Sequence, residues 1–122
     1  MSRYYTKSQE WVDFDESLKI AAIGMTDYGQ QQMGEIIHVE LPRIGTVLEA
    51  GESSCMIESV KTTTDLYTPV AGKVVAINKD VQDNPCLLND EAEKSWVFKV
   101  TYTQKPEGLL TPEQYTKMMA AI

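Results

Sequence analysis

The sequence contains few of the residues that metal sites, disulfide scaffolds and nucleophilic enzymes require. Two cysteines, Cys55 and Cys86, and one histidine, His38, occur among 122 residues. The cysteines lack Cys-x-x-Cys spacing, so no metal site is expected, and two reduced thiols are favoured over a disulfide. His38 lies in an apolar strand pattern, which indicates a structural role, and Cys55 alternates with Ile57, which favours packing in the core.

Positive charge and catalytic sequence signatures are also scarce. Lys and Arg number 11 against 18 Asp and Glu, which gives a net charge of −7. Nucleic-acid binding needs a basic surface, so this balance argues against it and favours solubility and basic protein partners. Neither a glycine-rich phosphate loop nor a Gly-x-Ser-x-Gly turn is present, which argues against nucleotide-binding enzymes and hydrolases.

Long apolar segments are absent as well. No stretch has the length and apolar character of a transmembrane helix, and residues 1–5 have no apolar signal region. We therefore expect no membrane partner and a cytoplasmic location, or a mature mitochondrial form whose leader was trimmed. The length fits a single domain over residues 1–122, and a monomer is expected; such a chain buries roughly two-thirds of its unfolded surface.

Short strand-forming segments dominate the sequence. Alternating apolar residues predict a first hairpin over residues 11–14 and 18–23, with Gly24 ending its second strand. Further strands are predicted at residues 35–41, 46–48, 54–59, 65–70, 73–77 and 96–102, with turns at 49–52 and 78–80. Segments 45–51 and 72–78 resemble each other, which suits a two-layered sandwich with approximate twofold symmetry.

Two helices are predicted. Thr26 is a suitable N-cap for a short helix near residues 27–33, and Gly34 can end it. Thr111 with Pro112 and Gln114 forms a capping box that begins a C-terminal helix near residues 112–121. Its apolar face, which we expect to dock on the sheet, consists of Tyr115, Met118, Met119 and Ile122.

Lys61 lies between two predicted strands. Glu58 precedes it by three residues and Asp65 follows it by four. The turn contains no glycine, which favours a type I turn over a primed one, and the successive threonines after Lys61 are stiff at χ1. A rigid hairpin that presents one amine suits acylation by another enzyme, which would remove its charge.

These residues resemble a known family. Glu-Ser-Val-Lys at residues 58–61 and Asp-Leu-Tyr-Thr-Pro-Val-Ala-Gly at 65–72 are similar to the lipoylation site of glycine cleavage system H proteins. Further similar segments are residues 5–11, 24–28, 39–42, 83–85 and 96–100. The resemblance implies a mainly β fold of the lipoyl/biotinyl type, a flattened β-barrel sandwich also called a barrel-sandwich hybrid.

The resemblance also implies a function. Lys61 would carry lipoate in amide linkage, and the chain would be a non-catalytic shuttle for the aminomethyl intermediate of glycine breakdown. Its partners would be glycine decarboxylase (P protein), aminomethyltransferase (T protein), dihydrolipoamide dehydrogenase (L protein) and lipoate-attaching enzymes. The difficult chemistry would then belong to the cofactors and the partners, while this chain would supply carriage and orientation.

Several acids receive roles by the same resemblance. Glu10 and Asp65, helped by Ser8, would hold the loaded arm, because carboxylates accept charge-assisted hydrogen bonds from a basic amine. Glu58 would be read by lipoate-attaching enzymes. The sequence departs from the family at three places. Gln9 replaces the usual histidine, Gln32 replaces a histidine found in some members, and the segment 89–95 is shorter than usual.

Three other functions are alternatives to this role. A biotin carrier shares the fold, but methionines typically flank its lysine, whereas Val60 and Thr62 flank Lys61. An H-like protein acting mainly as a lipoate relay to other lipoate-dependent enzymes is a second alternative, which the unusual segment 89–95 leaves open. A small hydrolase or transferase is disfavoured by the shortage of catalytic groups.

Overall fold

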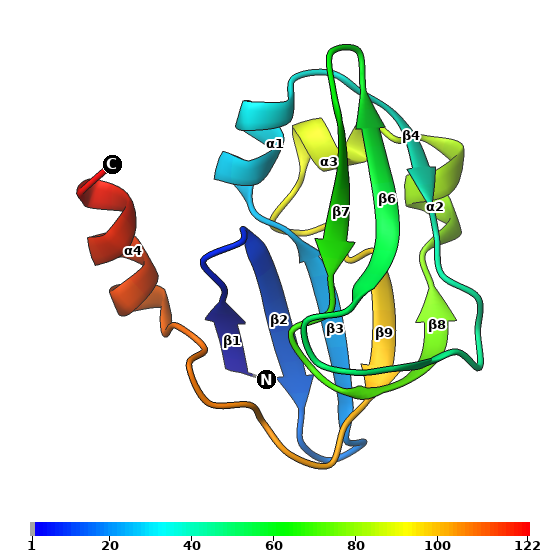
Figure 1. The fold of residues 1–122 in the computed structure, drawn as a ribbon, viewed down its shortest axis with the longest axis vertical. Coiled ribbons are helices and arrows are strands. Elements are labelled where there is room, and N and C mark those ends of the chain that lie inside the picture. Colours follow the sequence, from blue (N-terminus) through cyan, green and yellow to red (C-terminus); the bar gives the residue numbers. More distant parts are fainter. Residues whose placement is uncertain (1) are drawn as a thin grey trace.

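The computed structural model describes residues 2–122 and shows a mainly β protein (Figure 1). The strands are β1 (Ser2–Tyr5), β2 (Glu10–Asp15), β3 (Ile20–Met25), β4 (Ile36–Glu40), β5 (Val47–Leu48), β6 (Ser53–Ser59), β7 (Thr63–Tyr67), β8 (Gly72–Ile77) and β9 (Phe98–Thr101). The helices are α1 (Asp27–Met33), α2 (Lys79–Asp83), α3 (Leu87–Asp90) and α4 (Pro112–Ala120). None of these helices is long and apolar enough to cross a membrane.

Two antiparallel sheets form the body of the protein. One has the strand order β1-β2-β3-β9-β8-β5, and the other has the order β4-β6-β7. The predicted first hairpin is confirmed, since β2 and β3 pair from Glu10 opposite Met25 to Asp15 opposite Ile20. The β6–β7 hairpin projects at the top of the molecule, beyond the end of the six-stranded sheet (Figure 1). The predicted fold class, with its short helix at α1 and its C-terminal helix at α4, is therefore confirmed.

The two glycine-bounded segments that resemble each other pair in the structure. Val47 of β5 lies opposite Lys73 of β8, and Leu48 lies opposite Gly72. Gly72 is required here because a Cβ atom would lie 1.7 Å from the carbonyl oxygen of Thr101 on β9. The similarity in sequence therefore corresponds to two short strands that run antiparallel at one edge of the larger sheet.

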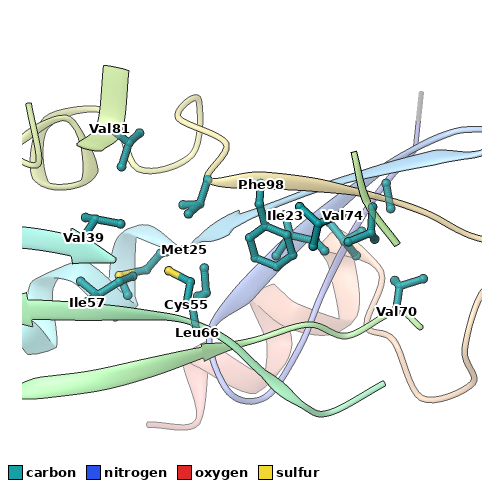
Figure 2. Packing of buried hydrophobic residues seen from close by; sticks show 14 of the residues in the cluster. Ile23, Met25, Val39, Cys55, Ile57, Leu66, Val70, Val74, Val81 and Phe98 are labelled. Atoms are coloured by element: carbon teal, nitrogen blue, oxygen red, sulfur yellow. The ribbon is translucent and has the colours of Figure 1, made fainter. Parts of the chain in front are cut away.

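The core lies between the two sheets. Alternate residues of the strands point into it, among them Ile23, Phe98, Ile57 and Leu66 (Figure 2). Burying one such side chain contributes about 1.5–3 kcal/mol to folding. Cys55 belongs to this cluster, as predicted, and burial raises the pKa of its thiol to about 12. A disulfide is absent between the two cysteines, both of which the structure describes as free thiols.

Gly24 does not end a strand, so that prediction was wrong. β3 continues to Met25, and Gly24 lies opposite Trp11 of β2. A Cβ atom at Gly24 would lie 2.4 Å from the Trp11 ring, so glycine makes room for the indole. The indole N–H donates to the carbonyl oxygen of Ala92 at 3.0 Å, and the guanidinium of Arg3 lies 3.9 Å from the ring centre.

His38 is exposed, although its apolar surroundings in the sequence suggested a buried position. A bulge in the pairing of β4 with β6 falls between Ile36 and His38. The bulge interrupts the alternation of faces, so Ile36 and Val39 are buried whereas Ile37 and His38 are exposed. The only histidine of the chain therefore lies on the surface rather than in the core.

Three elements were not predicted. β1 pairs with β2 at the edge of the larger sheet, and α2 and α3 form where the sequence indicated turns and loops. The side-chain oxygen of Asn78 accepts a hydrogen bond from the backbone N–H of Asp80 at 3.2 Å, which caps α2. The predicted turn at residues 78–80 is therefore the beginning of a helix.

The C-terminal helix α4 begins as predicted but does not dock on the face of the sheet. Thr111 and Gln114 form the capping box, with hydrogen bonds of 3.2 and 2.9 Å. No residue of α4 is buried, and Ile122 is 74% exposed. The ring of Tyr115 stacks on Tyr5 of the edge strand β1, with centroids 4.3 Å apart. Figure 1 shows α4 to one side of the body, because it meets only the edge of the sheet.

Candidate functional site

Lys61 lies at the tip of the β6–β7 hairpin, as predicted. β6 ends at Ser59 and β7 begins at Thr63, so the tip comprises residues 60–62. The Lys61 side chain is exposed. Neither Val60 nor Lys61 has a positive φ, which excludes a primed turn and agrees with the expectation from the absence of glycine. The structure therefore presents one primary amine at the end of a projecting hairpin.

Ser59 fixes the backbone of this tip. Its side chain is buried, and its Oγ accepts hydrogen bonds from the backbone N–H groups of Thr62, at 3.1 Å, and Lys61, at 3.3 Å. The Ser59 hydroxyl also lies 3.2 Å from the carbonyl oxygen of Thr62, which accepts the Ser59 backbone N–H at 2.8 Å. Sequence reasoning missed this role. The available signal was a serine directly before a turn, where its hydroxyl commonly bonds nearby backbone groups.

The tip is also held from outside the hairpin. The backbone N–H of Val60 donates to the carbonyl oxygen of Glu35 at 2.9 Å. Gly34, which ends α1 as predicted, has a φ of +80°, and a Cβ atom there would lie 3.1 Å from Cε of Lys61. The aliphatic part of the Lys61 side chain therefore passes close to Gly34. Glycine suits this position because it adopts the positive φ without strain and because a side chain there would crowd Lys61.

A cleft of about 190 Å³ lies beside β7. Ser8 and Gln9 line it from the turn before β2, Gly29 and Gln32 line it from α1, and Asp65 lines it from β7. Asp65 follows Lys61 by four residues, which corresponds to roughly 13 Å along an extended strand. A long acyl group on Lys61 can therefore reach the cleft if it folds back along β7.

The structure brings two of the three predicted arm-docking residues into this cleft. Ser8 and Asp65 line it and are exposed, whereas Glu10 is only 2% exposed. One carboxylate oxygen of Glu10, Oε1, accepts hydrogen bonds from the hydroxyls of Ser8 and Thr6, both at 2.6 Å. Burial raises the pKa of the Glu10 carboxyl, while hydrogen bonds from Ser8, Thr6 and the Tyr67 backbone act in the opposite direction. The buried Glu10 carboxylate thus orients the Ser8 hydroxyl by accepting its hydrogen bond.

Glu58 lies near the tip on the outer face of the smaller sheet. It is half-buried on β6, opposite Thr63 of β7 and His38 of β4. Its neighbours Ile57 and Ser59 point to the buried face. Glu58 is therefore accessible to a protein that approaches the hairpin at Lys61, which is what a recognition residue requires.

Both glutamines that depart from the family pattern line the cleft. Gln9 has a φ of +70°, and its side-chain oxygen accepts hydrogen bonds from the hydroxyls of Thr26, at 2.7 Å, and Tyr115, at 2.5 Å. Because Thr26 caps α1 and Tyr115 belongs to α4, Gln9 joins the two helices at one side of the cleft. Gln32 lies on the exposed face of α1.

The short segment 89–95 is built into the fold. One carboxylate oxygen of Glu93, Oε2, accepts the backbone N–H of Asp27 at the beginning of α1 at 2.7 Å, and Oε1 accepts the hydroxyl of Tyr5 at 3.0 Å. A carboxylate at this end of a helix is electrostatically favourable. The segment therefore anchors α1, which forms one wall of the cleft. Across residues 2–122, no three His, Cys, Asp or Glu residues gather in a group that could hold a metal ion.

Comparison with known proteins identifies the family. Residues 3–122 match the model of the glycine cleavage H-protein family. The chain belongs to the glycine cleavage H-protein family. The resemblance predicted from residues 58–72 is therefore confirmed.

Individual family members are similar over nearly their whole length. The glycine cleavage system H protein of Thermobifida fusca is 44% identical over 115 residues, which cover 93% of this chain and 90% of the relative. That of Carboxydothermus hydrogenoformans is 41% identical over 118 residues, covering 94% and 89%. The crystal structure of a glycine cleavage system H protein from Mycobacterium marinum superposes with a TM-score of 0.89 at 30% identity, covering 98% and 97%.

Family membership gives the chain the role of an H protein, a carrier component of the glycine cleavage system. The names of the relatives favour this role over that of a lipoate relay. The close structural match also agrees with the predicted two-sheet fold.

Proposed function

We propose that Lys61 carries lipoate in amide linkage and that the chain acts as the lipoyl shuttle of glycine cleavage. The observation that carries this proposal is the exposed Lys61 amine on a hairpin tip whose backbone is fixed by Ser59 and by the Glu35 carbonyl. A fixed backbone with a free amine suits an enzyme that must acylate one lysine among several. Glu58 lies on the accessible face of the same hairpin and is the residue that such an enzyme would read.

The composition of the cleft suits a lipoyl group. Met25, Met33 and Leu66 line it with apolar, largely buried side chains, and these match an aliphatic acyl chain. Ser8 and Asp65 lie among the polar residues of the same lining, which also include Gln9, Gln32 and Thr64. When bound, lipoate supplies a dithiol that takes up and releases the aminomethyl group derived from glycine. The residues present therefore fit both the chain of the cofactor and a basic group at its end.

The residues of the cleft hold the arm without taking part in the chemistry. The Asp65 carboxylate accepts a charge-assisted hydrogen bond from an amine, and the Ser8 hydroxyl, oriented by Glu10, supplies a second contact. Docking removes the end of the arm from bulk water. The chain is non-catalytic in this account, and the P, T and L proteins act in turn on the arm that it presents.

Reconstitution tests the proposed function. Lipoylated wild-type protein is combined with purified P, T and L proteins, and glycine-dependent ammonia release is measured. We expect turnover with wild type and with Lys73→Arg, an exposed lysine on β8, and none with Lys61→Arg. Lipoylated wild type that supports no glycine-dependent turnover, but transfers its lipoyl group to another lipoate-dependent enzyme, would contradict the shuttle role and support the relay alternative.

A further inference from the structure

The side chain of Asn89 on α3 makes hydrogen bonds to the segment 34–36, which contacts the hairpin tip. The side-chain oxygen of Asn89 accepts the backbone N–H of Ile36 at 2.8 Å. Its Nδ2 donates to the carbonyl oxygen of Gly34 and to the side-chain oxygen of Gln30, both at 2.9 Å. One amide group therefore bonds to the backbone on both sides of Glu35 and also to α1.

Glu35, the residue enclosed by these bonds, contacts the tip. Its carbonyl oxygen accepts the backbone N–H of Val60, which directly precedes Lys61. Hydrogen bonds therefore run from Asn89 to the segment 34–36, and from Glu35 to the residue beside the target lysine. Without Asn89, the Gly34 carbonyl and the Ile36 N–H would lose their side-chain partner in a part-buried setting, and the segment would have to move to satisfy them.

We propose that Asn89 is a positioning residue for Lys61, acting through the segment 34–36 and the Glu35–Val60 hydrogen bond. This inference rests on the proposed acylation of Lys61. An attaching enzyme meets a hairpin tip that is already in one conformation. Loss of Asn89 lets the tip populate other conformations, and the apparent affinity of the enzyme then falls with the fraction of competent tip. We expect the KM of the attaching enzyme to rise and its kcat to stay the same, because the amine that is acylated is unchanged.

Amide hydrogen exchange tests whether Asn89 orders the tip through the segment 34–36. In Asn89→Ala we expect the Val60 amide to exchange about tenfold faster than in wild type, while the Ile23 amide in the larger sheet is unchanged. Asn84→Ala removes the same side chain from an exposed position in the loop before α3 and is expected to leave Val60 unchanged. If Asn89→Ala does not fold, Asn89→Asp serves instead, because it keeps the acceptor for Ile36 but loses both donated bonds. Unchanged protection of Val60 in the folded variant would overturn the proposal.

Lipoylation kinetics give the second readout. Asn89→Ala is expected to raise the KM of a lipoate-attaching enzyme severalfold while kcat stays within about twofold. Val60→Pro removes the donor to Glu35 at a tip position whose φ is not positive, as the proline ring requires. Adding Asn89→Ala to Val60→Pro is expected to change KM little further, because both act through one bond. An undiminished effect of Asn89→Ala in the Val60→Pro background would overturn the proposal. A wild type that is never acylated would overturn the proposed function instead, and the exchange experiment would still decide whether Asn89 positions the tip.

Discussion

The tip of the β6–β7 hairpin and the helix α4 differ in how firmly they are attached. The tip is exposed, yet Ser59 and the Glu35 carbonyl hold its backbone from two sides. Helix α4 has a complete capping box and an apolar face, yet it rests chiefly on the stack of Tyr115 and Tyr5 and on a hydrogen bond to Gln9. Strong local signals therefore set the conformation of a segment but not its attachment, and exposure does not imply a loose backbone.

The difference arises from what lies beneath each element. The tip contacts the segment 34–36, and Asn89 links this segment to α3 and to Gln30 of α1 by hydrogen bonds. Helix α4 lies against β1, the edge strand of the larger sheet, where only a narrow surface is available. Three substitutions probe this contrast, from the largest expected effect to the smallest.

Ser59→Ala is expected to have the largest effect. It removes the acceptor of the Lys61 and Thr62 N–H groups, and we expect the free energy of unfolding to fall by about 1–2 kcal/mol, as measured by urea denaturation. Lipoylation should also slow, because the tip is less ordered. Ser53→Ala, at an exposed position on the same strand, is the matched control. Equal stability of the two variants would show that the tip is not held by Ser59.

Glu10→Gln tests the turn before β2, which carries Ser8 and Gln9, and its effect is smaller because hydrogen bonds from Ser8 and Thr6 offset part of the burial. The pKa of Glu10 is raised in the folded protein, so the folded state holds this proton more tightly than the unfolded state does. Its contribution is present at low pH and is lost as pH rises through the folded-state pKa.

Denaturation at a series of pH values measures this loss. The stability of wild type relative to Glu10→Gln should decrease as pH rises above about 4.3, the ordinary glutamate value, and then level off. Glu107→Gln, at an exposed position, controls for the change in net charge. A difference between wild type and Glu10→Gln that does not vary with pH would contradict the raised pKa.

Tyr115→Phe is expected to have the smallest effect. It removes the hydrogen bond to Gln9 and leaves the stack on Tyr5 intact, so the loss should stay below about 1 kcal/mol. Lipoylation of Lys61 should not change. A loss of stability as large as that of Ser59→Ala would mean that α4 belongs to the cooperative core, and the contrast between the two regions would fail.

Sequence patterns predicted the elements whose signals are local. Alternation predicted β2 and β3, caps predicted α1 and α4, and the strands around Lys61 placed it at a hairpin tip. The errors and omissions have long-range causes. Gly24 accommodates the Trp11 ring from the neighbouring strand, and His38 is exposed by a bulge that depends on pairing with β6.

The candidate site divides in the same way. Lys61, Ser8 and Asp65 could be named from the sequence, and the structure places the latter two in one cleft. Asn89 could not be named, because its partners are more than fifty residues away in the chain and only the fold brings them together. The burial of Glu10 was equally hidden, since a glutamate beside a tryptophan carries no local signal of depth. The lipoyl linkage, the docking roles of Glu10, Asp65 and Ser8, and the recognition of Glu58 by lipoate-attaching enzymes stay predictions.

Mass spectrometry of protein incubated with lipoate, ATP and a lipoate-attaching enzyme tests the central claim most directly. We predict one lipoyl adduct, mapped to Lys61 by peptide analysis, present in Lys73→Arg and absent in Lys61→Arg. An unmodified wild type, or an adduct on another lysine, would contradict the assignment of Lys61 as the carrier residue.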